Sequence, residues 1–341
     1  MLDDPSSVSR MDRRDLLSQL AGLPEQLLKG KELTKGLGSM PKPESLIIQG
    51  MGGSGIVGDI VRDWLSPLVP IPISTNKDSA LHPLVDRRTL LILISYSGNT
   101  METLEAFKVG IKRTGDVVCI GSGGRLLETA RKKGVGTIAV PGGLQPRCAL
   151  GHMLGASVRV LRKAGIHDGE RELASSAAHL KGLRAKLMPG TATRANPAKG
   201  LALELKDKIP IICAHQGIAS CATRWQTALN ENAKVLSWTN TTPEMMHNEV
   251  EGLGSDDRSE DFALVFLEEG GEPAQVAKAM EFLEKRTKAR VVRVKAGGKG
   301  KLERMLHLIY LGDFVSYYLA ALRGVDPMPV RVIEGLKKAT D

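Results

Sequence analysis

Short apolar runs alternate with amphipathic stretches along the first half of the chain. Helical spacing of apolar residues marks stretches between these runs and one after the last run, at 56–65, 101–113, 126–133 and 149–164. The runs themselves are mostly apolar on both faces, which predicts buried strands at 45–49, 71–74, 90–95, 117–120 and 137–140. Strands and helices in regular succession predict a parallel sheet with helices on both faces.

A second alternation of the same kind follows a polar, helically patterned segment. It predicts strands at 210–214, 262–267 and 291–294 and helices near 220–235, 273–288 and 302–323. The halves look like two copies of one α/β plan, although no clean residue-level repeat is visible. We therefore expect an α/β fold with two doubly wound domains, each a parallel sheet flanked by helices. The expected parts are a first domain at 1–165, a linking helical region at 166–196, a second domain at 197–325 and a tail at 326–341.

Length and composition support this picture of a soluble protein. The 341 residues suffice for two domains, and 42% apolar and 25% charged residues are ordinary for a globular chain. The longest apolar runs are far shorter than the roughly 20 residues of a membrane span. The first 14 residues carry charge and no apolar run, so they do not resemble a signal peptide. We expect a cytoplasmic protein without a membrane partner.

The charge of the chain does not point to nucleic acid. The net charge is +9, but the basic residues are scattered, and the aromatic residues, 4% of the chain, are not interleaved with arginine. A basic balance also suits an anionic small substrate. We expect no nucleic-acid partner.

The cysteines and histidines give no local metal site. The four cysteines form no CxxC pair, and the seven histidines form no HxH or HxxxH pair. Cys119 and Cys213 lie inside predicted strands and read as buried packing residues. We expect no metal and no cofactor.

A glycine-rich loop follows the first predicted strand. Residues 50–55 (GMGGSG) match G-x-G-x-x-G and precede a helix, where glycines let backbone N–H groups approach an anion. Gly53 and Ser54 are the candidate binding residues. The pattern fits a dinucleotide, a sugar phosphate or a simple tight turn. A dinucleotide needs an acidic residue at the end of the next strand, and Asp78 comes four residues too late and follows a lysine, which disfavours a nicotinamide cofactor.

A second loop carries the clearer chemistry. Ser95, Ser97 and Thr100 stand between the strand at 90–95 and the helix at 101–113, and Gly98 lets the chain turn so that the hydroxyls converge. Hydroxyl and amide donors match the three acceptor oxygens of a phosphate monoester. One capping residue would suffice for the helix alone, so three hydroxyls favour phosphate binding over a plain N-cap.

These motifs resemble the sugar-isomerase domain family, whose signature is this strand, SxSGxT loop and helix. The resemblance extends, in order and spacing, to the bifunctional phosphoglucose/phosphomannose isomerases from about residue 40 to the C-terminus. The segments that carry it are 50–59 (GMGGSGIVGD), 95–103 (SYSGNTMET), 145–147 (QPR), 229–234 (LNENAK) and 247–249 (HNE). It implies two sugar-isomerase domains, a homodimer, no metal, and interconversion of glucose 6-phosphate and mannose 6-phosphate with fructose 6-phosphate through a cis-enediol.

The reaction needs a base that moves a proton between C2 and C1, and a carboxylate with a raised pKa suits this. A lone glutamate on a helix is usually solvated, but Asn230 and Asn232 bracket Glu231 in an otherwise apolar segment. The resemblance implies that Glu231 is the base. It also implies that His247, in a loop, opens the sugar ring and reaches the site from the partner subunit. A histidine suits that step because it titrates near neutral pH.

Two further cations complete the expected site. Arg147 follows a strand end, where α/β sheets bind ligands, and would stabilise negative charge on the enediolate oxygen. The family's closing segment contributes a lysine, which we assign to Lys337 by register after Ile333, with Lys338 as the adjacent rival. Lys337 could equally offset a helix dipole. Met328, which lies between Pro327 and Pro329, could also face the pocket, but we assign it no role.

Two other functions compete with an isomerase. Sugar-isomerase domains also occur in regulators that sense phosphosugars, but these usually add a helix-turn-helix, and nothing before residue 40 has the length or basic face for one. A nicotinamide dehydrogenase lacks its ribose-binding acid here.

Overall fold

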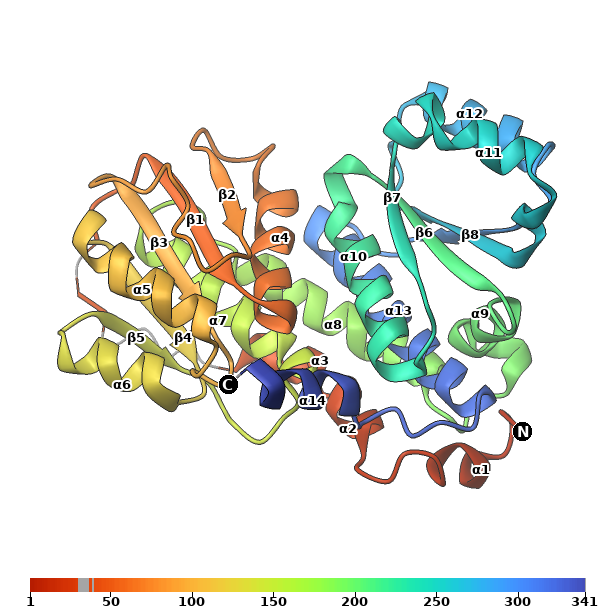
Figure 1. Ribbon diagram of the computed structural model, residues 1–341, viewed down its shortest axis with the longest axis horizontal. Helices are drawn as coiled ribbons and strands as arrows, with labels where there is room; N and C mark the ends of the chain where they lie inside the picture. The colour runs from red at the N-terminus through yellow and green to blue at the C-terminus, as the bar shows by residue number, and fades with distance from the viewer. Residues whose placement is uncertain (30–36, 39, 341) are drawn as a thin grey trace. The chain divides into compact units, whose positions relative to one another are not determined.

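The computed structural model describes residues 1–29, 37–38 and 40–340 (Figure 1). It divides into two compact units, which we call the N-terminal unit (22–180 and 298–303) and the C-terminal unit (1–21, 181–297 and 304–341). The first 21 residues group with the C-terminal unit rather than with the sheet that follows them in the chain. The domain boundaries expected from the sequence therefore stay a prediction.

The N-terminal unit holds a five-stranded, all-parallel sheet in the order β2-β1-β3-β4-β5. Its strands are β1 (Ser45–Gly50), β2 (Ile73–Asn76), β3 (Thr89–Ile94), β4 (Val117–Gly121) and β5 (Gly136–Ala139). Its helices are α3 (Leu23–Leu28), α4 (Gly52–Leu65), α5 (Met101–Arg113), α6 (Gly124–Lys132), η1 (Pro146–Cys148) and α7 (Leu150–Lys163). All five predicted strands are confirmed within two residues.

Side chains of this sheet pack against helices on both of its faces. Leu91, Leu93 and Cys119 face α5 and α6 in one apolar cluster. On the other face Gly58 of α4 lets the helix approach Ile48, to which an added Cβ would come within 3.1 Å. Helices α4 and α7 pack against each other on this second face. Both faces are thus buried at the centre of the sheet, which is why β1, β3 and β4 are mostly apolar.

The C-terminal unit repeats the plan with four parallel strands in the order β7-β6-β8-β9. These are β6 (Ile209–His215), β7 (Trp238–Thr242), β8 (Phe262–Glu268) and β9 (Arg290–Lys295). The main helices are α9 (Pro197–Glu204), α10 (Ala219–Ala228), α11 (Glu249–Ser255), α12 (Ala274–Glu284), α13 (Lys301–Leu322) and α14 (Arg331–Thr340). The remaining elements of this unit are α1 (Pro5–Ser9), α2 (Leu16–Ala21), η2 (Thr193–Ala195), η3 (Gln216–Ile218), the π-helix η4 (Leu229–Ala233), η5 (Glu244–His247) and η6 (Asp257–Asp261), and α8 (Glu170–Leu187) runs from the N-terminal unit into it.

The core of the C-terminal unit also has two layers. Cys213, Leu264 and Phe266 pack with α11 and α12 on one face of the sheet. Helix α10, which follows β6, is fastened to α13 by the Trp225 indole, whose Nε1 donates to Leu308 O at 2.7 Å. The α/β class with two doubly wound parallel sheets is confirmed.

Helix α13 is the one described helix that is long and apolar enough to cross a membrane. However, 89% of its most apolar window is buried inside the protein. Its composition is therefore that of a core helix, in agreement with a soluble fold.

Candidate functional site

The two predicted binding loops follow neighbouring strands of the N-terminal sheet. In the order β2-β1-β3-β4-β5 the chain winds in one direction from β1 and in the other from β3. Ligands of open α/β sheets bind at the carboxyl edge of the strands at such a switch point. The loop at 50–55 leaves β1 there and the loop at 95–100 leaves β3.

Glycine is required in the first loop because other backbone lies against it. A Cβ on Gly55 would come within 2.5 Å of Gly50 O, and a Cβ on Gly50 within 2.6 Å of Ile94 O. A Cβ on Gly53 would come within 3.0 Å of the Arg147 Cα and backbone N. The glycines thus bring the loop against both β3 and the segment that carries Arg147.

The hydroxyls of the second loop are ordered by one another. Ser95, 1% exposed, accepts from Gly98 N at 3.1 Å and donates through Oγ to Thr100 Oγ1 at 3.0 Å. Within the described residues the Thr100 side chain makes no capping bond to α5, although Thr100 is the N-cap residue. Ser97 is exposed, with its Oγ accepting from Asn99 N at 3.2 Å.

Gly98 holds the sharp turn that the sequence expects. Its φ is +69°, and an added Cβ would lie 1.9 Å from Gly123 O. The loop is also tied to the next one by bonds from Ser122 N to Tyr96 O at 2.8 Å and from Leu126 N to Gly98 O at 2.9 Å. These contacts therefore fix the hydroxyl-bearing loop at the amino end of α5.

Ser54 joins the two loops. Its buried Oγ accepts from Tyr96 N at 3.0 Å and lies 3.5 Å from Met153 Sδ, while its N–H donates to Met51 O at 2.9 Å. These bonds give Ser54 a structural role, because they hold the two loops together.

Arg147 lies in η1, eight residues after β5, rather than directly at the strand end. Its side chain is buried, and its Nη1 donates to Gln145 Oε1 at 3.4 Å. Tyr96 anchors the preceding chain because its hydroxyl donates to Pro141 O at 3.0 Å and accepts from Leu144 N at 3.1 Å. The loop at 50–55 therefore contacts both the loop at 95–100 and the segment that carries Arg147, and Tyr96 of the second loop holds the chain just before that segment.

Glu231 lies in an irregular part of the C-terminal unit. The helix expected over 220–235 ends at Ala228, and the chain continues as the π-helix η4. π-Helices are rare, appear mostly as single turns inside α-helices and are frequently found at functional sites. Asn232 is fully buried and its Nδ2 donates to Ser316 Oγ at 2.9 Å, whereas Asn230 is exposed. Glu231, between them, is half-buried.

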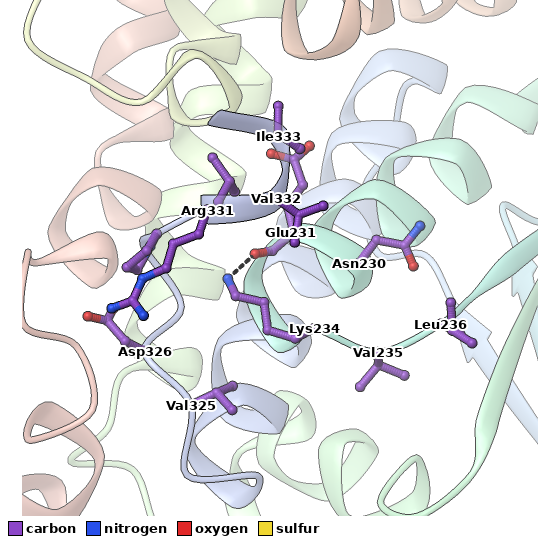
Figure 2. A pocket seen from close by; sticks show the side chains of 12 residues that line it. Asn230, Glu231, Lys234, Val235, Leu236, Val325, Asp326, Arg331, Val332 and Ile333 are labelled. Carbon is purple, nitrogen blue, oxygen red and sulfur yellow. Dashed lines mark hydrogen bonds between the residues drawn. The ribbon is translucent and has the colours of Figure 1, made fainter. Parts of the chain in front are cut away.

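Glu231 lines a cavity of about 690 Å³ within the C-terminal unit, which suits a small ligand. One wall comes from 230–236 and the other from the tail, as Figure 2 shows. Its polar lining residues are Asn230, Glu231, Lys234, Asp326 and Arg331. The last three were not expected from the sequence, although Lys234 stands in the motif that carries Glu231.

The tail places the remaining candidates differently. Lys337 lies on α14 one turn after Ile333, a lining residue, and so shares its face of the helix. The side chain of its rival Lys338 lies outside the described part of the structure. Met328 is buried and is not among the lining residues.

His247 ends η5, a short helix where the sequence predicts a loop, and it is exposed. It is not one of the residues that line the Glu231 cavity. Asn248 caps α11, with its Oδ1 accepting from Glu249 N at 2.6 Å, which agrees with a role in shaping this segment.

The corresponding loops of the C-terminal unit have another character. After β8 the chain reads Glu268-Glu269-Gly270-Gly271-Glu272, with no hydroxyl. The Glu272 carboxylate accepts from Glu269 N at 2.6 Å and from Gly270 N at 3.1 Å. These N–H groups therefore already bind an internal anion.

Relatives with curated descriptions cover nearly the whole chain. A bifunctional phosphoglucose/phosphomannose isomerase from Caldicellulosiruptor bescii is 35% identical over 331 residues, which are 94% of this chain and 98% of the relative. One of the same description from Thermoplasma acidophilum is 36% identical over 294 residues, 86% and 89% of the two chains. The chain belongs to the bifunctional phosphoglucose/phosphomannose isomerase family.

Other matches agree with membership of this isomerase family. Residues 194–339 match the family described as "Bacterial phospho-glucose isomerase C-terminal SIS domain". A solved structure of a glucose-6-phosphate isomerase-like protein from Thermus thermophilus superposes with a TM-score of 0.65 at 23% identity, covering 99% of this chain and 98% of that one. This likeness shows that the fold is shared along the chain.

The side chains that could ligate a metal lie apart in the described part of the chain. Among the described residues, no group of three or more His, Cys, Asp and Glu side chains is arranged to hold a metal ion. The four cysteines are buried thiols, and burial raises the pKa of Cys119 to about 12. Thiolate chemistry at Cys119 is therefore disfavoured at neutral pH.

Proposed function

We propose that this chain interconverts glucose 6-phosphate and mannose 6-phosphate with fructose 6-phosphate. The relatives described as bifunctional phosphoglucose/phosphomannose isomerases support the substrates. The observation that carries the mechanism is the placement of Glu231 on the wall of a ligand-sized cavity in the C-terminal unit. We further propose that the enzyme is a cytoplasmic, metal-independent homodimer.

The phosphate is bound by the second loop of the N-terminal unit. Ser97 and Thr100 donate hydrogen bonds from their hydroxyl groups to the phosphate, and the dipole at the amino end of α5 favours its negative charge. Ser95 contributes by orienting Thr100, to which it donates. Gly53 admits the ligand close to the backbone. For Ser54 the bracing bond to Tyr96 N supports an indirect contribution to binding.

Glu231 takes the proton from C2 of the aldose and returns it to C1. The intermediate is a cis-enediol, in which C2 is trigonal, so both epimers give one common species.

The remaining candidates handle charge and protons around this step. Arg147 stabilises negative charge on the enediolate oxygen. His247 passes protons between the ring oxygen and O1, and its exposure supports access to the site of a partner subunit. Lys337 acts from the tail. It lies on the same face of α14 as Ile333, which lines the cavity.

The deciding experiment is a coupled assay for fructose 6-phosphate formation from each aldose phosphate, with EDTA present throughout. Wild-type protein should turn over both aldoses. Glu231→Gln should bind sugar phosphate but lose both activities by at least about 10²–10⁴-fold, because an amide cannot accept the proton. Deuterium wash-in at C2 should vanish with them.

Three outcomes contradict the proposal in different ways. Binding of sugar phosphates without turnover by wild-type protein would favour a regulatory role. Activity that EDTA removes and one divalent metal restores would reject the metal-free mechanism. A variant that loses one aldose activity and keeps the other would exclude a common enediol.

A further inference from the structure

Lys234 has an unfavourable backbone conformation next to the cavity. It caps η4 with φ +57° and ψ +38°, the left-handed region that glycine and asparagine adopt readily and other residues rarely. Among the described non-glycine residues, only Asp15 and Asp207 share a positive φ. Lysine is a poor choice for this turn unless its side chain is needed.

The lysine side chain connects the two walls of the cavity. Its Nζ donates to Glu231 O at 2.5 Å, the contact drawn in Figure 2, and to Pro327 O in the tail at 3.5 Å. Lysines at helix ends often bond terminal carbonyls and offset the helix dipole. That explanation covers the bond to Glu231 O, but not the second bond, which reaches outside the helix.

The position of Pro327 in the chain supports a connection between the two walls. Pro327 lies between Asp326 and Pro329, both of which line the cavity, and α14 begins shortly afterwards. An ammonium that holds Glu231 O and Pro327 O at once therefore sets the spacing between the η4 turn and the start of the tail.

We propose that Lys234 is a positioning residue that fixes the Glu231 turn and clamps the tail beside it. This inference rests on the proposed role of Glu231 as the base. Lys234 acts through the two carbonyls and does not contact the reacting atoms. Its loss should therefore lower kcat with little change in KM, and should loosen the tail.

The test uses three variants of the full-length protein. Lys234→Asn suits the left-handed backbone but removes the ammonium, Lys234→Met removes it at the same side-chain length, and Lys234→Arg keeps a cationic donor. Lys208→Met is the matched control. Lys208 immediately precedes β6, and its ammonium also donates to a backbone carbonyl, Glu260 O at 2.6 Å.

Two readouts are measured for each variant: kcat and KM for both aldoses, and the rate of tryptic cleavage in α14, at Arg331 and Lys337. Lys234→Asn and Lys234→Met should lower kcat roughly ten- to hundredfold, the effect of losing one charge-assisted hydrogen bond. Both should expose the tail to faster cleavage. Lys234→Arg should recover most of both properties, and Lys208→Met should match wild type.

Wild-type kcat and cleavage rate together with wild-type folding in Lys234→Asn would overturn the proposal. A kcat loss in Lys234→Met that Lys234→Asn does not share would show that the ammonium is dispensable once the residue suits the left-handed turn, and would overturn the clamp. An inactive wild type would contradict the isomerase function, and the cleavage rates would still test the clamp.

Discussion

The hydroxyls expected to hold phosphate divide into two exposed groups and two buried ones. Ser97 is exposed and Thr100 partly so, while Ser54 and Ser95 are buried and bonded within the protein. From the sequence all four look alike, because spacing shows which residues share a loop but not which way each Oγ points. Only the structure separates the donors available to a ligand from those that build the loop.

Removing an outward donor should weaken substrate binding. Ser97→Ala and Thr100→Ala each delete one hydrogen bond to a charged phosphate, worth about 1.5–3 kcal/mol. KM should rise roughly ten- to a hundredfold, with folding intact. The measurement is KM by the coupled assay and melting temperature by circular dichroism. Ser45→Ala, at the start of β1, is the control, and an unchanged KM in both loop variants would reject the phosphate assignment.

His152 is a buried titratable group that the proposed mechanism does not use. It lies in α7 at 5% exposure, and burial, with the Lys29 charge as a smaller cause, lowers its pKa from 6.5 to about 4. As the pH falls below 6.5, His152 therefore becomes protonated in the unfolded chain, whereas in the folded protein it stays neutral until about pH 4. Stability is lost through that window.

The pH dependence of unfolding can test this residue directly. Lowering the pH from 7 to 5 should cost about 2 kcal/mol of unfolding free energy through His152. His152→Gln should show a shallower loss by about that amount over the same range. Urea unfolding of both proteins at the two pH values provides the comparison, and identical losses would show that His152 titrates normally.

At the scale of elements, the turn at Gly98 determines where the second loop stands. Gly98 and Gly134 have the same φ of +69°, but a Cβ would lie 1.9 Å from Gly123 O in the first and meet nothing within 4 Å in the second. The pair therefore separates the cost of the backbone angle from the cost of the collision.

Both substitutions to alanine should lose about 1–2 kcal/mol of stability from the left-handed backbone. Gly98→Ala should lose more, and it should also raise KM because the 95–100 loop must move away from 122–126. Urea unfolding and KM measurements on the two variants check this. Equal destabilisation and equal KM values would mean that the loop yields without cost.

Elements were predictable where burial dictated the sequence. The central strands β1, β3 and β4 of the N-terminal sheet are mostly apolar because helices cover both faces, so the sequence pattern revealed them. Strand β7 (WTNTT) was missed because it lies at a sheet edge and its residues are mostly polar and half-exposed or exposed. The change from α10 to the π-helix left no readable signal, since Leu229 and Ala233 suit either kind of helix.

At the scale of the whole molecule, the two units share a winding plan but not a chemistry. Both place their first strand second from one edge of the sheet and turn back at the next strand. The loop after β3 carries hydroxyls, whereas the loop after β8 carries an internal carboxylate on its own N–H groups. The plan follows from periodicity, but which loop receives the phosphate follows from side chains. A chain with two similar units is therefore expected to offer one phosphate site.

His247 belongs to this largest scale, because it is exposed and is not among the residues lining the Glu231 cavity of its own chain. If it serves the partner's site in a symmetric dimer, each site combines Glu231 of one chain with His247 of the other. A dimer of one Glu231→Gln chain and one His247→Ala chain then has one site with both residues intact and one with neither.

Mixing equal amounts of the two variants under subunit exchange should therefore restore activity. Random pairing makes half of the dimers mixed, and each has one intact site of two, so roughly a quarter of wild-type turnover should return for both aldoses. Each variant exchanged with itself is the control. If His247 acts within its own chain, every mixed dimer contains only singly damaged sites, and the mixture should merely average the two variants. Because the two arrangements predict such different rates, the coupled assay on the mixture decides between them.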